Sequence, residues 1–250
     1  MRFQGKTAFI TGGAVGLGRA FARALTAEGA SVAIAEIDTE GAELTAAKLV
    51  ADGARAIALR CDVADERQVD AAVATTVETL GGVDILINNA GRHLLKYNQP
   101  FSALTRDEVR GMFDVNVMGV VNCTLACRDS MAARGGGAVV NISSTTSFQS
   151  RSPYGVSKLA VRGLTVAFAN ELAPDLIRVN AIAPGLTNTE NTLIDVPPVM
   201  IDEIVEDLQL IHRVGTEPDI VSAMLFLCSA DASFITGETL RVSGGYPLTV

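Results

Sequence analysis

The sequence has little of what nucleic-acid binding or membrane insertion requires. It contains no tryptophan, two histidines and 5% aromatic residues, and its formal net charge is −8 over 250 residues. A surface that binds a phosphate backbone needs clustered lysine and arginine, and here these residues are scattered. No apolar run approaches the ~20 residues of a membrane span, and the N-terminal apolar run is too short for a signal peptide. We therefore expect a cytoplasmic protein with neither nucleic acid nor membrane as a partner.

Cysteine is also scarce, and its spacing argues against metal or disulfide chemistry. The four cysteines, Cys61, Cys123, Cys127 and Cys228, include no Cys-x-x-Cys pair. Cys123 and Cys127 are four residues apart in an apolar stretch, which places them on one face of a helix. Free cysteine in a reducing compartment behaves as a small buried apolar residue. We expect four buried thiols and no metal site.

Aliphatic residues and glycine dominate instead. Apolar residues make up 48% of the chain, with 23 glycines, and strand-like apolar runs alternate with segments of helical periodicity. The expected strands cover residues 6–11, 31–36, 54–61, 83–88, 138–143, 177–183 and 239–242. The expected helices cover residues 15–29, 40–52, 65–80, 106–134, 153–172 and 218–228. This alternation predicts a single α/β domain over residues 1–250, a three-layer, doubly wound parallel sheet (Rossmann fold) of about seven strands with helices on both faces.

Glycines follow the first expected strand in a pattern typical of a dinucleotide-binding turn. Residues 11–18 read TGGAVGLG. Glycine lets the backbone turn tightly and lets a pyrophosphate approach it, and the N–H groups of the following helix then face the phosphates. The alternative is a merely flexible turn, but a strand before it, a helix after it and an acid at the end of the next strand favour the dinucleotide site. The residues expected to form this part of the site are Gly12, Val15, Gly16, Leu17 and Gly18.

The acid at the end of the second expected strand is Glu36. A carboxylate there can accept hydrogen bonds from both ribose hydroxyls of NAD and repels the 2′-phosphate of NADP. The next residue is Ile37, and the glycine turn carries Ala14 and Val15, so the cations that an NADP site favours are absent from these positions. The alternative is a solvated glutamate at a strand end. We expect NAD as the cofactor.

Tyr154 and Lys158 stand four residues apart at the start of an expected helix, which places both side chains on one face. A free phenol has a pKa near 10, too high for a base at neutral pH. A neighbouring ammonium and a positive nicotinamide ring would stabilise the phenolate and lower that pKa. The pair alone is a weak signal, because this spacing arises by chance in many helices.

Further motifs follow other strands in a fixed order. NNAG at 88–91 follows the fourth strand, ISS at 142–144 the fifth, and Pro184-Gly185 the sixth. With these motifs the chain resembles the short-chain dehydrogenase/reductase family from Lys6 to about Gly245. The resemblance implies an enzyme that transfers a hydride between nicotinamide and a secondary alcohol or ketone, an NAD(P)-dependent dehydrogenase acting on CH–OH groups with NAD preferred.

The resemblance also implies a role for individual residues. Tyr154 would be the general acid/base, Lys158 would lower its pKa and hold the nicotinamide ribose, and Ser144 would hydrogen-bond the substrate oxygen. Asn116 would hold a water molecule in the proton relay. The remaining cofactor contacts that it implies are Asp62 and Val63 at the adenine, Asn88, Asn89, Ala90 and Gly91 at the adenosine ribose, and Pro184, Gly185, Thr187 and Thr189 at the nicotinamide.

One departure from the family pattern lies between the serine and the tyrosine. Nine residues separate Ser144 from Tyr154, whereas the family commonly has a longer loop. A shorter loop changes the wall of the pocket and leaves Ser143 and Ser147 as alternatives to Ser144.

The resemblance further implies a substrate lid at about residues 186–213 and a homotetramer. The lid is mostly apolar, with Leu193, Ile194, Val199 and Met200 among its residues, which suggests a small or medium-sized substrate of apolar character. The residues that follow Gly91, beginning with Arg92 and His93, and the loop at 145–149 are also expected to surround the substrate. His93 either bonds a polar group of the substrate or is an ordinary loop histidine. His212 is expected to be structural.

Three other functions compete with this interpretation. A non-catalytic NAD-binding regulatory or scaffold protein would not need Tyr154, Lys158, Ser144 and Asn116 together. A sugar-nucleotide epimerase or dehydratase would need an additional substrate domain. An enoyl reductase spaces its tyrosine and lysine more widely than this chain does.

Overall fold

The structure is a computed structural model that describes residues 1–92, 95–189 and 196–248. Its centre is a seven-stranded sheet in the order β3-β2-β1-β4-β5-β6-β9, in which every neighbouring pair is parallel. The strands are β1 (Thr7–Thr11), β2 (Ser31–Glu36), β3 (Ala56–Arg60), β4 (Ile85–Asn88), β5 (Gly137–Ile142), β6 (Ile177–Pro184) and β9 (Thr239–Val242). The doubly wound parallel sheet that the sequence predicts is therefore confirmed.

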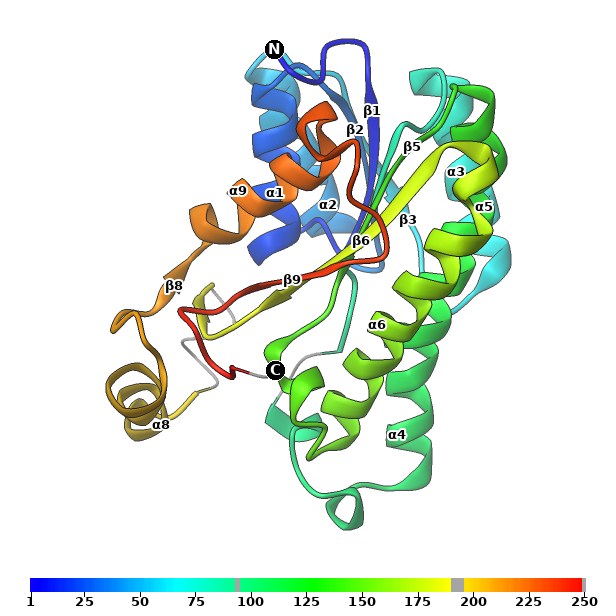
Figure 1. The fold of residues 1–250 in the computed structure, drawn as a ribbon. Coiled ribbons are helices and arrows are strands. Elements are labelled where there is room, and N and C mark those ends of the chain that lie inside the picture. The colour runs from blue at the N-terminus through cyan, green and yellow to red at the C-terminus, as the bar shows by residue number, and fades with distance from the viewer. Residues whose placement is uncertain (93–94, 190–195, 249–250) are drawn as a thin grey trace.

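Helices cover both faces of this sheet (Figure 1). One layer contains α1 (Gly16–Ala27), α2 (Thr39–Ala51) and α9 (Glu217–Cys228). The other contains α3 (Glu66–Leu80), α5 (Gly119–Ala133) and α6 (Pro153–Glu171). None of the helices in the described ranges is both long enough and apolar enough to span a membrane.

The strands are apolar on both sides because each side of the sheet has its own core. Ile10 and Ile34 pack into the cluster under α1 and α9, while Phe9 and Ala33 point to the opposite cluster under α3 and α5. All four of these side chains are fully buried. Side chains alternate across a strand, so a sheet covered by helices on both faces needs continuous aliphatic strands. That requirement explains the runs seen in the sequence.

The long helix expected over residues 106–134 is interrupted. It consists of α4 (Arg106–Phe113), a π-helical turn (Asp114–Met118) and α5. The helix begins at a capping box, in which Thr105 accepts from the Glu108 amide at 3.2 Å and the Glu108 carboxylate accepts from the Thr105 amide at 2.9 Å. A π-turn keeps the chain helical, so the apolar periodicity does not reveal it, although such turns are frequent at functional sites.

The four cysteines are buried and unpaired, as the sequence predicts. Burial raises the pKa of the Cys61 thiol to about 11 and that of Cys228 to about 12. The reactive form of cysteine is the thiolate, so these side chains are packing residues rather than nucleophiles.

A separate lobe, here called the lid lobe, follows β6 and lies beyond the carboxyl ends of the strands, where Figure 1 labels β8 and α8. It includes the two-stranded pair β7 (Thr187–Asn188) and β8 (Gly215–Thr216), and the short helix α8 (Pro198–Asp202). A π-helical turn, Glu203–Leu208, continues α8. Strand β7, helix α8 and the π-helical turn belong to the segment at about residues 186–213 that the sequence predicts as a lid, whereas β8 lies just beyond it.

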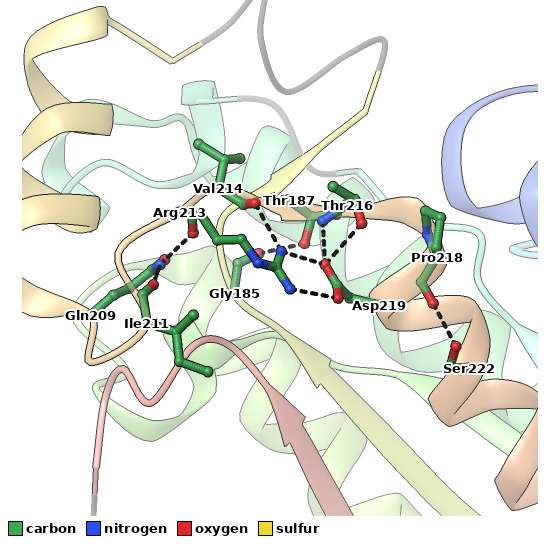
Figure 2. A network of polar contacts seen from close by, with 10 residues as sticks. All are labelled: Gly185, Thr187, Gln209, Ile211, Arg213, Val214, Thr216, Pro218, Asp219 and Ser222. Atoms are coloured by element: carbon green, nitrogen blue, oxygen red, sulfur yellow. Dashed lines mark hydrogen bonds and ion pairs between the residues drawn. The ribbon is translucent and has the colours of Figure 1, made fainter.

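The returning end of this lobe is anchored to α9 (Figure 2). The Arg213 guanidinium donates to both carboxylate oxygens of Asp219, at 2.7 and 2.8 Å. The same carboxylate accepts from the Thr216 amide at 2.8 Å and so caps the start of α9. These bonds hold the pKa of Asp219 well below its ordinary value, chiefly through the Arg213 hydrogen bond. The lobe therefore has a firm base at residues 213–219.

An ion-pair cluster connects neighbouring strands at their amino ends, at the opposite end of the sheet from the lid lobe. The Asp84 side chain is 2% exposed and accepts from Lys6 Nζ at 2.9 Å and Arg134 Nη2 at 2.9 Å. It also accepts from the Thr7 amide at 2.9 Å. Although burial opposes the charge, these partners hold the Asp84 pKa below its ordinary value.

Candidate active site

A cavity of about 650 Å³ opens at the carboxyl ends of the parallel strands. It extends from Glu36 at the end of β2 to Gly185 after β6, and so crosses the point between β1 and β4 where the strand order reverses. Open parallel sheets bind ligands at that point. The predicted site residues that line the cavity are Gly12, Val15, Gly16, Leu17, Glu36, Asp62, Val63, Asn89, Ala90, Gly91, Ser144, Tyr154, Lys158, Pro184, Gly185, Thr187 and Thr189.

The glycine turn has the backbone that its sequence requires. Gly12 and Gly16 have φ values of +67° and +52°, in the region that favours glycine. Gly18 does not belong to the cavity lining, and a Cβ on it would lie 2.0 Å from the Gly12 carbonyl oxygen. Gly18 thus permits close packing of α1 on the turn, whereas Gly12 and Gly16 face the cavity.

The start of α1 opens into this cavity without a side-chain cap. Val15 at the N-cap position makes no side-chain hydrogen bond, and the first turn contains no acidic residue. The first N–H groups of a helix have no partners within it and carry a partial positive charge. An anion such as a pyrophosphate fits a helix start of this kind.

Glu36 lies beside the turn, as the sequence predicts. Its carboxylate accepts from the Ile37 amide at 2.9 Å and from the Ala14 amide at 3.3 Å. Ile37 is 60% exposed and also lines the cavity. The carboxylate is therefore held at the rim, next to a side chain that offers no positive charge.

The NNAG segment divides between the cavity and the core. Asn89 donates through its side chain to the carbonyl oxygens of Thr11 at 3.0 Å and Gly12 at 2.8 Å, which fastens the glycine turn to β4. Asn88, which the resemblance places at the ribose, points the other way and donates to Asn141 at 2.8 Å inside the sheet. Asn88 is 4% exposed and is not a lining residue, because side chains alternate along β4.

Tyr154 and Lys158 lie together on the first turns of α6, as their spacing predicts. Ser152 caps the helix by accepting from the Gly155 amide at 3.1 Å. Both side chains line the cavity but are buried, with 6% of Tyr154 and 5% of Lys158 exposed. Lys158 Nζ donates to the Ile142 carbonyl at 2.8 Å and lies 5.8 Å from the centroid of the Tyr154 ring.

Burial is the largest cause of the pKa shifts of both Tyr154 and Lys158. It raises the pKa of Tyr154 to about 12, and a hydrogen bond with Ser144 opposes the rise. It lowers the pKa of Lys158 to about 8. The direction for Tyr154 is opposite to the one expected from Lys158, because removing the phenolate from water outweighs its stabilisation by neighbouring groups.

The three candidate serines have different partners. The Ser144 hydroxyl accepts from the Thr146 amide at 3.2 Å and the Thr146 hydroxyl at 3.0 Å, and is hydrogen-bonded with Tyr154. Ser143 donates instead to the Lys158 carbonyl at 2.9 Å. The Ser147 hydroxyl is buried, has no hydrogen-bond partner in the described structure and does not line the cavity. The shortened loop, which begins with a 3₁₀ turn, therefore leaves Ser144 next to Tyr154.

Asn116 lies in the π-helical turn and is 1% exposed. It is not a lining residue; its carboxamide accepts from the Arg92 amide at 2.8 Å and donates to the Ser157 hydroxyl at 3.1 Å. Asn116 Oδ1 and Lys158 Nζ lie 3.3 and 3.4 Å from the point that a Cβ on Gly91 would occupy. Asn116 thus adjoins the site from behind Gly91 and holds the backbone of Arg92.

The lid lobe supplies the apolar end of the cavity. Val196, Met200 and Ile204 line the same cavity as Ser144 and Tyr154. Other predicted contacts, namely His93, Leu193 and Ile194, lie outside the described residues. His212 is exposed, and its Nδ1 lies 2.9 Å from the Val205 carbonyl oxygen.

Known proteins are similar to this chain in both sequence and fold. A human protein, dehydrogenase/reductase SDR family member 4, is 36% identical over 249 residues, which cover 97% of this chain and 87% of that protein. The chain belongs to the short-chain dehydrogenase/reductase family.

Other similarities extend over the same length. A family model described as Enoyl-(Acyl carrier protein) reductase matches residues 12–247. An uncharacterized oxidoreductase of Mycobacterium tuberculosis is 42% identical over 243 residues, 97% of this chain and 98% of that protein. A solved 7α-hydroxysteroid dehydrogenase complexed with NADH and 7-oxo glycochenodeoxycholic acid has a TM-score of 0.91 and 32% identity, covering 98% of this chain and 95% of that one.

Some cavity residues of this short-chain dehydrogenase/reductase were not predicted as site residues. These residues include Cys61 and Asn98. Arg92 and Thr146, which belong to the segments expected to surround the substrate, line the cavity as well. No signal in the sequence indicated Asn98, because its place depends on a hydrogen bond from Ser152, 54 residues away in sequence, at 2.7 Å.

Proposed function

We propose that this protein is an NAD-dependent dehydrogenase/reductase that interconverts a secondary alcohol and its ketone. One observation carries the proposal: Tyr154, hydrogen-bonded with Ser144 and close to Lys158, lies in the same cavity as the open start of α1. A proton-transfer group and a pyrophosphate-binding helix start in one cavity are what hydride transfer from a dinucleotide requires.

The lining residues fit a dinucleotide along the carboxyl edge of the sheet. The N–H groups of Val15, Gly16 and Leu17 would hold the pyrophosphate, and Glu36 would hold the adenosine ribose and disfavour a 2′-phosphate. Lys158 would hold the nicotinamide ribose. The carboxamide group of the nicotinamide would bind near residues 184–189. The residues of this segment that line the cavity are Pro184, Gly185, Leu186, Thr187 and Thr189. When bound, the nicotinamide would accept or supply the hydride and, once oxidised, add a positive charge beside Tyr154.

Tyr154 would carry the proton in both directions. In alcohol oxidation the phenolate removes the hydroxyl proton, and in ketone reduction the phenol returns one to the carbonyl oxygen. The Ser144 hydroxyl, already hydrogen-bonded with Tyr154, would hold the same substrate oxygen. Burial favours the neutral phenol. The Lys158 ammonium would favour the phenolate, and the balance between the two effects would set the working pH.

The lid lobe suggests a substrate with an apolar body. Val196, Met200 and Ile204 present aliphatic or thioether side chains to the cavity. A lid of this kind excludes water from the hydride transfer. The solved 7α-hydroxysteroid dehydrogenase supports a cyclic secondary alcohol as the substrate type.

A cofactor-reduction screen with Tyr154→Phe tests the proposal. Wild-type protein is incubated with secondary alcohols, polyols, hydroxysteroids and hydroxy acids, each with NAD⁺ and with NADP⁺, and absorbance of the reduced cofactor is followed. We expect turnover with NAD⁺, which Tyr154→Phe abolishes while the Kd for NADH stays within about twofold. Retained activity in Tyr154→Phe would contradict the mechanism, and a preference for NADP⁺ would contradict the role of Glu36.

Two other functions are distinguished by the same samples. A regulatory or scaffold protein would bind NADH but turn over none of the alcohols. The description of the matching family model raises enoyl reduction, which a crotonyl thioester with NADH tests directly. We expect no reduction of the thioester, because Tyr154 and Lys158 are four residues apart rather than more widely spaced.

We also propose a homotetramer, since apolar side chains remain exposed on two separate surfaces. Leu125 on α5 and Val166 on α6 are 47% and 51% exposed, and Leu240 on the edge strand β9 is 40% exposed. Exposed apolar patches commonly mark interfaces between copies. Analytical ultracentrifugation should give four times the chain mass. The cytoplasmic location stays a prediction from composition.

A further inference from the structure

Arg92 is a charged residue of the cavity lining whose guanidinium has few partners in the described structure. Its guanidinium makes one side-chain hydrogen bond, to the Tyr97 hydroxyl at 3.4 Å, and no carboxylate of the described residues pairs with it. Lys96 nearby is already paired with Glu108 at 2.5 Å. A guanidinium offers five donors, so most of those on Arg92 are available to a ligand.

The position of Arg92 is built rather than accidental. Asn116 holds both sides of its backbone, accepting from the Arg92 amide at 2.8 Å and donating to its carbonyl at 3.3 Å. The guanidinium passes over Gly111 in α4, where an added Cβ would lie 3.3 Å from Nη1. Glycine within a helix costs about 1 kcal/mol relative to alanine, and at this position it leaves room beside the Arg92 guanidinium.

The charges in the cavity are separated along its length. Among the described lining residues, the acidic ones are Glu36 and Asp62, which belong to the adenosine end, and the basic ones are Arg92 and Lys158. The Lys158 ammonium is engaged by the Ile142 carbonyl. The hydrogen-bond partner of Arg92, Tyr97, packs in one apolar cluster with Tyr154. Arg92 is therefore the cation available to a ligand at the substrate end.

We propose that Arg92 binds an anionic group, a carboxylate in the simplest case, carried by the substrate away from its reacting carbon. This inference rests on the proposed function and narrows its substrate class to hydroxy or oxo acids with an apolar body. The guanidinium matches a carboxylate in a two-pronged hydrogen bond, while Met200 and Ile204 contact the apolar part.

Matched pairs of oxo acids and their methyl esters test this assignment. The probes are 4-oxopentanoate, 4-oxocyclohexanecarboxylate and an oxo-steroid carboxylic acid, each compared with its methyl ester in NADH oxidation. For at least one pair, kcat/KM should be about ten- to a hundredfold higher for the acid than for the ester, as for a hydrogen bond to a charged group. Arg92→Gln should remove this difference through a higher KM for the acid and leave the ester unchanged.

Two variants make the result specific. Arg106→Gln removes one positive charge from an exposed position on α4 outside the cavity lining, and it should keep the preference for the acid. Arg92→Lys keeps the positive charge but loses the planar guanidinium that can donate two parallel hydrogen bonds to a carboxylate, so it should retain part of the preference for the acid. Thermal unfolding of each variant checks that the fold is intact.

The outcomes separate this inference from the proposed function. If neutral ketones and esters are reduced but acids are never preferred, Arg92 does not bind a substrate anion although the dehydrogenase function stands. The same conclusion follows if Arg92→Gln lowers kcat/KM for acid and ester equally, or if it weakens NADH binding, which would place Arg92 at the cofactor. If no acid, ester or neutral ketone is reduced, the proposed function itself is wrong.

Discussion

The ammonium nitrogen of Lys158 lies 5.8 Å from the centroid of the Tyr154 ring, and both groups are buried. Lys158 also donates to the Ile142 carbonyl at the end of β5, so its position depends on the sheet as well as on α6. An ammonium close to a buried phenol favours the phenolate, an effect opposite in direction to that of burial.

Lys158→Met should therefore change the pH dependence of catalysis as well as its rate. Oxidation needs the phenolate, so its kcat/KM rises with pH, whereas reduction needs the phenol and falls only at alkaline pH. Without the ammonium the phenolate loses stabilisation, and the rising limb for oxidation should move to higher pH, with kcat/KM at pH 7 lower by about 10²-fold or more. Steady-state pH profiles of both directions check this. An unmoved limb would show that Lys158 acts only by binding the cofactor.

Ser144→Ala should lower kcat by about 10²-fold or more, the usual effect of removing a donor to a developing oxyanion. Ser147→Ala is the matched control, because the Ser147 hydroxyl is buried without a partner in the described structure and lies outside the cavity lining. That control should leave kcat within about twofold and should not reduce stability. Equal activities of the two variants would mean that the shortened loop has moved the substrate oxygen away from Ser144.

Glu36→Ala combined with Ile37→Arg should move the cofactor preference toward NADP. The change removes the carboxylate that faces the Ala14 amide and puts a cation at an exposed lining position. The ratio of kcat/KM for NADP⁺ to that for NAD⁺ should rise at least about tenfold. Glu40→Ala, which removes an exposed acid on α2 outside the lining, should leave the ratio unchanged. An unchanged ratio in the double variant would place the adenosine ribose elsewhere.

Asp84→Asn should destabilise the fold without affecting the chemistry. The variant leaves Lys6 and Arg134 without their shared carboxylate, and we expect the free energy of unfolding to fall by about 2 kcal/mol, the value of a hydrogen bond to a charged group. Asp129→Asn, an exposed position on α5, is the control and should change stability little. Urea unfolding measures both, and kcat should be unchanged at temperatures well below the unfolding midpoint.

The same carboxylate gives a pH signature. Because the Asp84 pKa is lower in the folded protein than in the unfolded chain, its stabilisation is complete above the ordinary aspartate pKa, near 4. It is lost as the pH falls through the lowered value. The difference in unfolding free energy between wild type and Asp84→Asn should therefore shrink in acid. A constant difference would indicate that the charge of Asp84 does not matter.

Local patterns predicted most of the fold because they follow directly from helix and strand geometry. The strand expected at 31–36 is β2, Ser31–Glu36, and that expected at 239–242 is β9, Thr239–Val242. Boundaries elsewhere moved by one or two residues, where helix ends depend on caps such as Ser152. The π-helical turn at Asp114–Met118 was not predicted, since it leaves the helix continuous.

The sequence by itself determined the doubly wound sheet, the glycine turn and the placing of Tyr154 and Lys158 on one helix face. Each of these depends on spacing along a single strand, turn or helix. Only the tertiary structure decided that Ser144 is the serine next to Tyr154, that Asn88 points into the core, and that burial raises the Tyr154 pKa. It also decided that Arg92 lines the cavity and that its guanidinium makes one hydrogen bond, to Tyr97, in the described structure. Those properties depend on burial and on contacts between residues distant in sequence, which packing alone establishes.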